Sequence, residues 1–237
     1  MSDHGEGEGC PWAGFDWTRE RYEDMIRRVV PGYREQEPLI VEVLREAAPG
    51  GGGGPFRILE LGAGTGTLSR LVLETFPGAE LIAMDVSPVM LGECAGVLAP
   101  FGTRARLMEA DFATADLGSG YHAVVSRLAI HHLSDGEKRS LFGRVAEALQ
   151  PGGVFVSSDL IAGETEAETE AMLAEWREHM VSQGDDPAEW TQWLVGEADL
   201  PSPARSQVEW LLQAGFDEAR TIWRRANFAI LRAVKAG

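Results

Sequence analysis

The sequence predicts a doubly wound α/β fold with a seven-stranded, mostly parallel sheet whose last strand is reversed. Between residues 56 and 160, short apolar segments alternate with segments of helical spacing, which is typical of parallel strands joined by helices. Near the C-terminus, two apolar runs flank Arg225-Ala226-Asn227, which predicts an antiparallel hairpin. With 237 residues, the chain is long enough for one such domain, which we expect to span residues 18–237.

The residues before the sheet fall into a tail and two helices. Residues 1–17 are rich in glycine and acidic residues, and we expect them to form a flexible tail. Apolar residues at helical spacing in "RYEDMIRRVV" and "EPLIVEVLREA" predict two helices, which we expect to act as lid helices within residues 18–50. The glycine run at residues 50–54 predicts a flexible connection to the first strand.

The repeating part of the chain predicts five strands, "FRILEL", "ELIAMD", "ARLMEA", "AVVS" and "GGVFVSSDL". Helices are expected between them, and Ser134 with Glu137 forms a capping box at the start of the one before the fifth strand. Residues 163–200 depart from the repeat, because apolar residues recur four apart in "MLAEWREHM". We expect this helical insert to form a lid across the ligand-binding edge of the sheet. A further helix, "SQVEWLLQAG", precedes the hairpin.

Charge and composition limit the classes of partner. The formal net charge of -16 repels phosphate backbones and anionic lipid surfaces, so we expect neither a nucleic-acid nor a membrane partner. The sequence contains no run of about 18 apolar residues, and its start lacks the basic and apolar segments of a secretion signal. We therefore expect a cytoplasmic protein. Two distant cysteines, Cys10 and Cys94, predict neither a disulfide framework nor a thiolate metal cluster.

Alternate glycines mark a candidate ligand loop in "ILELGAGTG". Gly62, Gly64 and Gly66 directly follow a predicted strand and directly precede a predicted helix. Glycine allows positive φ angles and brings bare backbone close to a ligand, while the helix start offers unpaired N–H groups. The spacing differs from a dinucleotide fingerprint, because the third glycine comes one position early.

Polar residues at the ends of the next two strands extend this site. Asp85 ends the second strand about 20 residues after the loop, where a carboxylate can accept hydrogen bonds from ribose hydroxyls. Asp111 and Phe112 follow the third strand, where they can bind an adenine amino group and flank the ring. The alternatives are a helix cap for Asp111 and a core position for Phe112. Three strand ends thus offer contacts for amino-acid, ribose and adenine groups in order.

The pattern "LELGAGTG … MD … EADF … HHL … LQPGG" resembles the class I S-adenosylmethionine-dependent methyltransferases over residues 56 to 160. The resemblance implies a Rossmann-like fold, S-adenosylmethionine as the methyl donor and S-adenosylhomocysteine as the product. It also implies a set of cofactor-binding residues at the three strand ends: Gly62, Ala63, Gly64, Asp85, Val86, Asp111 and Phe112.

The ends of the chain, "MIRRVVPGYREQ" and "WRRANFAILRA", are similar to the carboxy-S-adenosylmethionine synthases. Those enzymes transfer a carboxyl group from prephenate to the cofactor for tRNA wobble-uridine modification. This resemblance implies that Tyr33 folds over the cofactor and that Arg127 contacts it, although the family has asparagine at the position of Arg127. It also implies a homodimer, because relatives with this N-terminal segment pair.

One position departs from the synthases in a way that affects the reaction. A gapless match from "LLQAGF" puts Gln192, beside Trp193, where the synthases have the arginine that pairs with the extra carboxylate; Arg205 is the nearest following arginine. An amide carries no charge and cannot replace that ion pair. We therefore expect methyl transfer from ordinary S-adenosylmethionine to a small-molecule acceptor. The alternatives are a carboxy-S-adenosylmethionine synthase, a non-catalytic cofactor-binding protein and, more distantly, a nicotinamide dehydrogenase.

Few side chains are obligatory for methyl transfer, which mainly needs positioning and, for a protic nucleophile, a base. His131 and His132 follow the fourth strand and are the candidate catalytic residues, since imidazole titrates near neutral pH. The alternative is a histidine that packs against the next helix. Tyr22, Trp176 and Trp193 are candidates for the substrate pocket, with a core role as the alternative. No acidic metal triad stands out, so we expect no metal.

Overall fold

The computed structural model describes residues 19–52, 55–188 and 199–237. The predicted tail at residues 1–17 lies outside the described residues, as do Gln192 and Trp193. The predicted flexible connection at residues 50–54 is described only in part. There the structure has a 3₁₀ turn, Pro49–Gly52, in which Gly50 has a φ of 59°.

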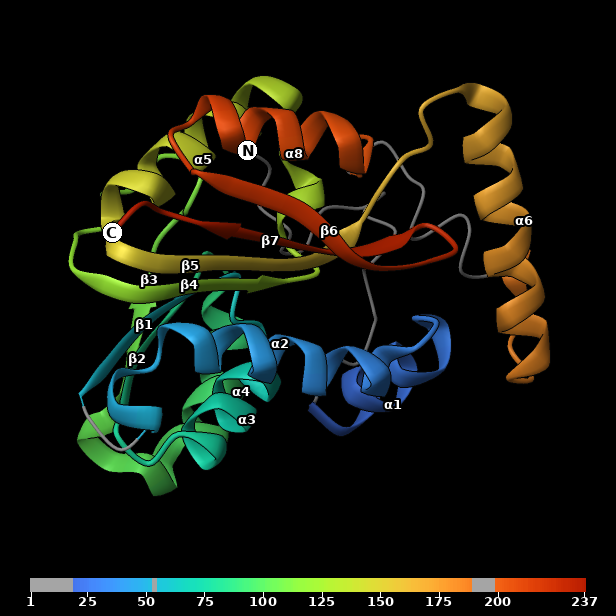
Figure 1. The fold of residues 1–237 in the computed structure, drawn as a ribbon. Coiled ribbons are helices and arrows are strands. Elements are labelled where there is room, and N and C mark those ends of the chain that lie inside the picture. Colours follow the sequence, from blue (N-terminus) through green and yellow to red (C-terminus); the bar gives the residue numbers. More distant parts are fainter. Residues whose placement is uncertain (1–18, 53–54, 189–198) are drawn as a thin grey trace.

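A seven-stranded sheet forms the centre of the molecule (Figure 1). Its strands lie in the order β3-β2-β1-β4-β5-β7-β6. The strands from β1 to β5 pair in parallel, while β7 is antiparallel to both of its neighbours. The predicted mostly parallel sheet with a reversed last strand is therefore confirmed. The strands are β1 (Phe56–Leu61), β2 (Ala79–Asp85), β3 (Ala105–Glu109), β4 (Tyr121–Arg127), β5 (Leu149–Leu160), β6 (Glu218–Arg225) and β7 (Phe228–Val234).

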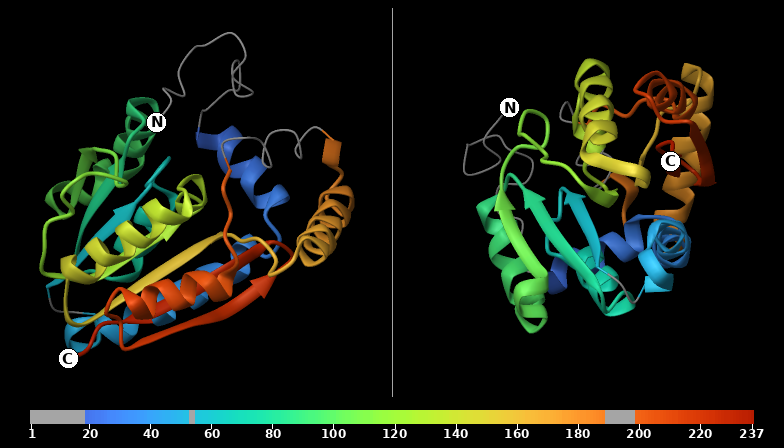
Figure 2. Two further views of the ribbon diagram at one scale, coloured as in Figure 1. Left: turned by 90° about the horizontal axis from the view of Figure 1, so that it is seen from above. Right: turned by 60° about the vertical axis from the view of Figure 1, so that its left-hand side comes forward.

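Helices cover both faces of the sheet (Figures 1 and 2). One face carries α2 (Tyr33–Ala47), α3 (Thr67–Thr75) and α4 (Pro88–Leu98), and the other carries α5 (Asp135–Ala148) and α8 (Ala204–Gln213). Successive residues of a strand enter different cores: Ile58 packs with the first set of helices, and Leu59 packs with the second. The capping box predicted at Ser134 and Glu137 is present at the start of α5.

Two helices, α1 (Arg19–Val29) and α6 (Glu166–Ser182), pack together beyond the layers of the sheet. In Figure 1, α6 stands at the end of the sheet away from the C-terminus. Trp176 of α6 is fully buried, contacts Phe228 of β7 and donates a hydrogen bond of 2.7 Å to the Val29 carbonyl of α1. The helix predicted within the insert is confirmed, while its role as a lid remains a prediction.

The second N-terminal helix, α2, is a layer of the fold itself. Its buried residues Ile40, Val43 and Leu44 pack against the sheet in the same core as Ile58. The lid role predicted for residues 18–50 therefore remains a prediction for α1. Among the described helices, none has both the length and the apolar content needed to cross a membrane.

Candidate active site

The glycine loop lies between β1 and α3 and has three glycines in the left-handed region, with φ angles of 71° at Gly62, 53° at Gly64 and 81° at Gly66. A Cβ at Gly62 would lie 2.3 Å from Cβ of Ala129, and one at Gly66 would lie 2.8 Å from Sγ of Cys94. At Gly64, by contrast, no described atom outside the adjoining residues of the loop would lie within 4 Å of an added Cβ. Packing therefore explains two of the glycines, and the third borders open space that a ligand could fill.

The loop is held by the end of β2. Backbone N–H groups of Gly62 and Ala63 both donate to the Met84 carbonyl at 2.9 Å. The carboxylate of Asp85 accepts from the Gly64 N–H at 2.7 Å through Oδ2 and from the Ser87 N–H at 2.9 Å through Oδ1. The structure thus brings Asp85 against the glycine loop, while its predicted contact with ribose hydroxyls remains a prediction.

A buried carboxyl group lies at the base of the loop. Glu60 of β1 accepts a hydrogen bond from the Ser69 hydroxyl of α3 and is 1% exposed. Burial raises the pKa of Glu60 to about 8, against the lowering effect of the Ser69 hydrogen bond. The carboxyl group therefore joins the strand before the loop to the helix after it. The sequence indicates its position beside the glycines but not this contact.

The residues after β2 and β3 flank the loop. Phe112 packs in the core on the α5 side, and its Cε1 atom would lie 3.6 Å from a Cβ at Gly62. Asp111 accepts from the Ala113 N–H at 2.8 Å within a turn, so it does not cap a helix as the alternative for this residue proposed. Val86, next to Asp85, is 44% exposed. The adenine contacts predicted for these residues remain predictions.

Arg127, at the end of β4, is a buried cation under α2. Its guanidinium carbon lies 3.4 Å from the ring centroid of Tyr33, and Nη2 donates to the Tyr33 carbonyl at 2.5 Å. Glu37 lies 3.7 Å from Nη1 as an ion-pair partner, yet Nε and Nη1 make no hydrogen bond within the described part of the chain. Burial raises the pKa of the Tyr33 hydroxyl, which keeps it neutral beside the guanidinium. The structure therefore brings Tyr33 and Arg127 together.

His131 belongs to a 3₁₀ turn, Ile130–His132, that follows β4. Its Nδ1 lies 2.5 Å from Oδ1 of Asp159 on the neighbouring strand β5. The other carboxylate oxygen of Asp159 accepts from the backbone N–H groups of Ile130 at 2.7 Å and His131 at 3.2 Å. Burial by itself raises the pKa of Asp159, but the charge and hydrogen bond of His131, the Leu160 N–H and the charge of His132 outweigh it, so this pKa lies below its ordinary value.

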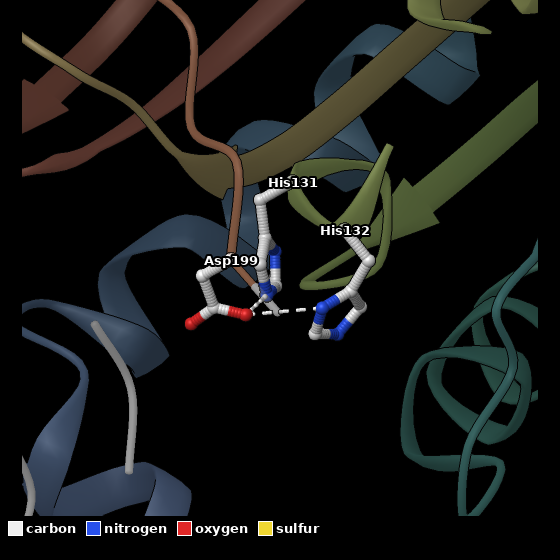
Figure 3. A group of neighbouring side chains, drawn as sticks. All are labelled: His131, His132 and Asp199. Carbon is white, nitrogen blue, oxygen red and sulfur yellow. Dashed lines mark ion pairs between the residues drawn. The ribbon is translucent and has the colours of Figure 1, made fainter. Parts of the chain in front are cut away.

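Asp199 approaches the two histidines from a different part of the chain (Figure 3). Its Oδ1 lies 3.0 Å from Nδ1 of His132 and 3.5 Å from Nε2 of His131. The Leu200 N–H donates to the His131 carbonyl at 2.8 Å, and Lys138 donates to the Leu200 carbonyl. The sequence reasoning missed both Asp159 and Asp199, because neither belongs to a local motif with the histidines.

The aromatic pocket candidates have different surroundings. Trp176 has no exposed surface and packs between α1, α6 and β7, which favours the core alternative for this residue. Tyr22 is half-buried and packs against the same cluster. Trp193 lies outside the described residues. The pocket roles of these residues remain predictions.

Residues 58–153 match the family model described as a methyltransferase domain. The chain is 24% identical over 216 residues to a carboxy-S-adenosyl-L-methionine synthase of Nautilia profundicola, with 90% of each chain covered. It is 36% identical over 116 residues to a malonyl-[acyl-carrier protein] O-methyltransferase of Chlorobium phaeovibrioides, covering 46% of this chain and 42% of that protein.

A solved structure with a similar fold is human N-acetylserotonin methyltransferase in complex with S-adenosylmethionine. The TM-score is 0.62 at 15% identity, and the match covers 100% of this chain. The chain spans 61% of the length of that methyltransferase. At this identity the likeness shows the fold alone.

Proposed function

The chain carries a methyltransferase domain at residues 58–153 and is an S-adenosylmethionine-dependent methyltransferase, and from this premise we propose that it methylates a small-molecule acceptor with a protic nucleophile. The observation that carries the proposal is the open space at Gly64 beside the Asp85 carboxylate. The large negative net charge supports a small molecule over a nucleic acid as the acceptor.

The proposed cofactor site follows the ends of the strands. The loop at Gly62, Ala63 and Gly64 would hold the amino-acid part, and Asp85 would accept hydrogen bonds from the ribose. Val86, Asp111 and Phe112 would surround the adenine. Gly64 has no Cβ at the point where its backbone borders open space, and the Asp85 carboxylate lies beside it. The residues present therefore fit the cofactor.

Tyr33 and Arg127 complete the proposed cofactor site from the α2 side. Two guanidinium nitrogens of Arg127 lack hydrogen bonds among the described residues, and buried donors of this kind call for an acceptor. A carboxylate is the acceptor that guanidinium binds best, so Arg127 would bind the carboxylate of the cofactor. The resemblance implies an asparagine at this position in the synthases, so the proposed contact would differ from theirs.

Acceptor chemistry would take place at His131. When bound, S-adenosylmethionine supplies an electrophilic methyl group on a positively charged sulfur. In this mechanism Nδ1 of His131 donates to Asp159, which lies 2.5 Å away, and Nε2 takes the proton that the acceptor loses. Asp159 then stabilises the resulting imidazolium. His132, whose side chain is 47% exposed, is the second candidate for this role.

A carboxy-S-adenosylmethionine synthase is the second candidate function. The observation that favours it is the similarity to such synthases over 90% or more of both chains. The amide at Gln192 supports methyl transfer instead, because it cannot form an ion pair with a carboxylated cofactor. A cytoplasmic location and a homodimer are further proposals that rest on the sequence and the resemblance.

The first experiment is mass spectrometry of the small molecule that freshly purified protein releases on denaturation. We expect S-adenosylmethionine or S-adenosylhomocysteine, and a cofactor heavier by one carboxyl group would instead support the synthase. A screen with methyl-labelled cofactor against hydroxyl, amine, thiol and carbon nucleophiles then tests turnover. Tight cofactor binding without turnover in any class would support a non-catalytic binding protein, and a titration with NADH tests the dehydrogenase alternative.

A further inference from the structure

His131, His132 and Asp199 form a compact cluster of metal-ligating side chains at the carboxyl end of the sheet (Figure 3). One ligand atom from each of the three residues lies within 4.8 Å of the other two. Asp199 and His131 are buried, with side chains 7% and 6% exposed, whereas the His132 side chain is 47% exposed. The cluster therefore has one side closed by protein and one side open to solvent.

The hydrogen bonds of Asp159 determine which nitrogen of His131 faces the cluster. Nδ1 of His131 lies 2.5 Å from Oδ1 of Asp159, whose other oxygen accepts the backbone N–H groups of Ile130 and His131, so Nδ1 faces Asp159 and Nε2 faces the cluster. Nε2 of His131 lies 3.5 Å from Oδ1 of Asp199. The nitrogen and the carboxylate oxygen thus face each other across a distance that a bound cation could bridge.

This arrangement has the outer shell that metal-binding histidines need. A ligating imidazole usually donates its other N–H to a carboxylate, which fixes the ring and strengthens the ligand. Asp159 has this relationship to His131. Asp199 is also fixed, because the adjacent Leu200 donates its N–H to the His131 carbonyl and accepts a hydrogen bond from Lys138.

The local charge also favours a cation. Asp159 and Asp199 supply two carboxylates, and Lys138 supplies one ammonium group that is already bonded to the Leu200 carbonyl and, at 2.7 Å, to the Ser202 hydroxyl. The two carboxylates outnumber this ammonium group, which favours a cation at the cluster.

We propose that Nε2 of His131, Nδ1 of His132 and Oδ1 of Asp199 bind a divalent transition-metal ion, with Zn²⁺ as the reference ion. Two imidazole nitrogens and one carboxylate oxygen form a donor set suited to such ions and leave coordination positions open. The exposed side of His132 gives water or an oxygen ligand access to these positions. The sequence predicted no metal because Asp199 is distant from the histidines along the chain.

The metal site does not depend on the proposed methyl transfer, but a bound metal would affect that reaction. A bound ion takes the Nε2 lone pair that would otherwise accept the proton of the acceptor. Occupancy of the site would therefore inhibit proton transfer by His131 while leaving the glycine loop and Asp85 free to bind the cofactor. This relationship separates the two proposals experimentally.

The test uses the full chain stripped with a chelator and then titrated with Co²⁺, followed by visible absorption, and with Zn²⁺ in equilibrium dialysis. We expect one ion per chain. His132→Gln and Asp199→Asn should each weaken binding by about tenfold or more, and Asp159→Asn should weaken it by a factor of about 10 to 100 through the outer shell. Matched controls are His179→Gln and the exposed Asp217→Asn, which should bind like the unmodified chain.

Absence of stoichiometric binding, or binding that is unchanged in both cluster variants, would overturn the metal site. Circular dichroism and calorimetric binding of S-adenosylhomocysteine check that the variants remain folded. If the unmodified chain binds Co²⁺ as expected but shows no affinity for S-adenosylhomocysteine, the methyl-transfer proposal fails and the metal site is supported. Failure of the metal site and failure of the methyl-transfer proposal therefore give different results.

Discussion

Asp159 contacts His131 twice, through the ring nitrogen Nδ1 at 2.5 Å and through the backbone N–H at 3.2 Å. The contact joins β5 to the 3₁₀ turn that follows its parallel neighbour β4. Ser158, directly before Asp159, pairs with Arg127, the last residue of β4. One carboxylate therefore fixes both the backbone and the imidazole of His131. In the proposed mechanism, Nε2 is then the nitrogen that accepts the proton.

Asp159→Asn should reduce methyl-transfer turnover by at least about a hundredfold, which is the lower range of a general-base contribution. The amide can donate a hydrogen to Nδ1 and so favour the wrong tautomer of His131, while the cofactor site is unchanged. Turnover and the dissociation constant of S-adenosylhomocysteine measure the two effects separately. The exposed Asp217→Asn serves as the control. Full turnover in Asp159→Asn would contradict the role of His131 as a base.

Asp85→Ala should weaken cofactor binding by roughly 1–3 kcal/mol, or about 5- to 150-fold, because ribose hydroxyls and the Gly64 N–H lose their acceptor. Isothermal titration calorimetry with S-adenosylhomocysteine measures the change. Glu80→Ala, at an exposed position of the same strand, should bind normally. An unchanged affinity in Asp85→Ala would argue against the ribose contact.

Gly64→Ala and Gly62→Ala should separate ligand binding from folding. At Gly64 an added methyl group meets no described atom, so the fold pays only the left-handed backbone strain of roughly 1–2 kcal/mol. The same methyl group would occupy the proposed cofactor space, and we expect at least a tenfold loss of affinity, about 1.4 kcal/mol. At Gly62 it would collide with Ala129, which adds an overpacking cost of about 1–3 kcal/mol.

Thermal unfolding and calorimetric titration together test this pair of variants. Gly62→Ala should show the greater loss of melting temperature. If Gly64→Ala bound S-adenosylhomocysteine as well as the unmodified chain does, the cofactor would not approach the loop at this position.

Glu60→Gln should stabilise the fold increasingly as pH rises. Burial raises the pKa of Glu60 from 4.5 to about 8, so between these values the unfolded chain releases a proton that the folded chain keeps. The free energy of unfolding of the unmodified chain therefore falls as pH rises through this window, by at most about 1.4 kcal/mol per pH unit from this group. Glutamine is neutral throughout and lacks this dependence.

Urea unfolding at several pH values between 5 and 8 measures the difference between Glu60→Gln and the unmodified chain. The exposed Glu80→Gln controls for the loss of one negative charge. A difference that stays constant with pH would show that Glu60 ionises normally in the folded chain.

Local patterns were sufficient for most of the fold. Strand and helix periodicity predicted the sheet, the hairpin and the helix of the insert, because each depends on which neighbouring residues are apolar. The glycine loop and Asp85 were also predictable, since a tight turn with positive φ and an acidic strand end leave direct marks in the sequence. By contrast, periodicity could not distinguish a core role from a pocket role for Trp176, because both need the same apolar spacing.

The sequence by itself determined the order of elements, the methyltransferase pattern and the glycine loop with its acidic partner, because these depend on short-range sterics and hydrogen bonding. Only the tertiary structure brought Asp159 and Asp199 to the histidines and Ser69 to Glu60. These contacts depend on strand pairing and on folding that brings together segments distant in sequence, which share no local pattern. The physical reason is that the packing of the core determines which groups lie beside a carboxylate. The spacing of residues along the chain does not contain this information.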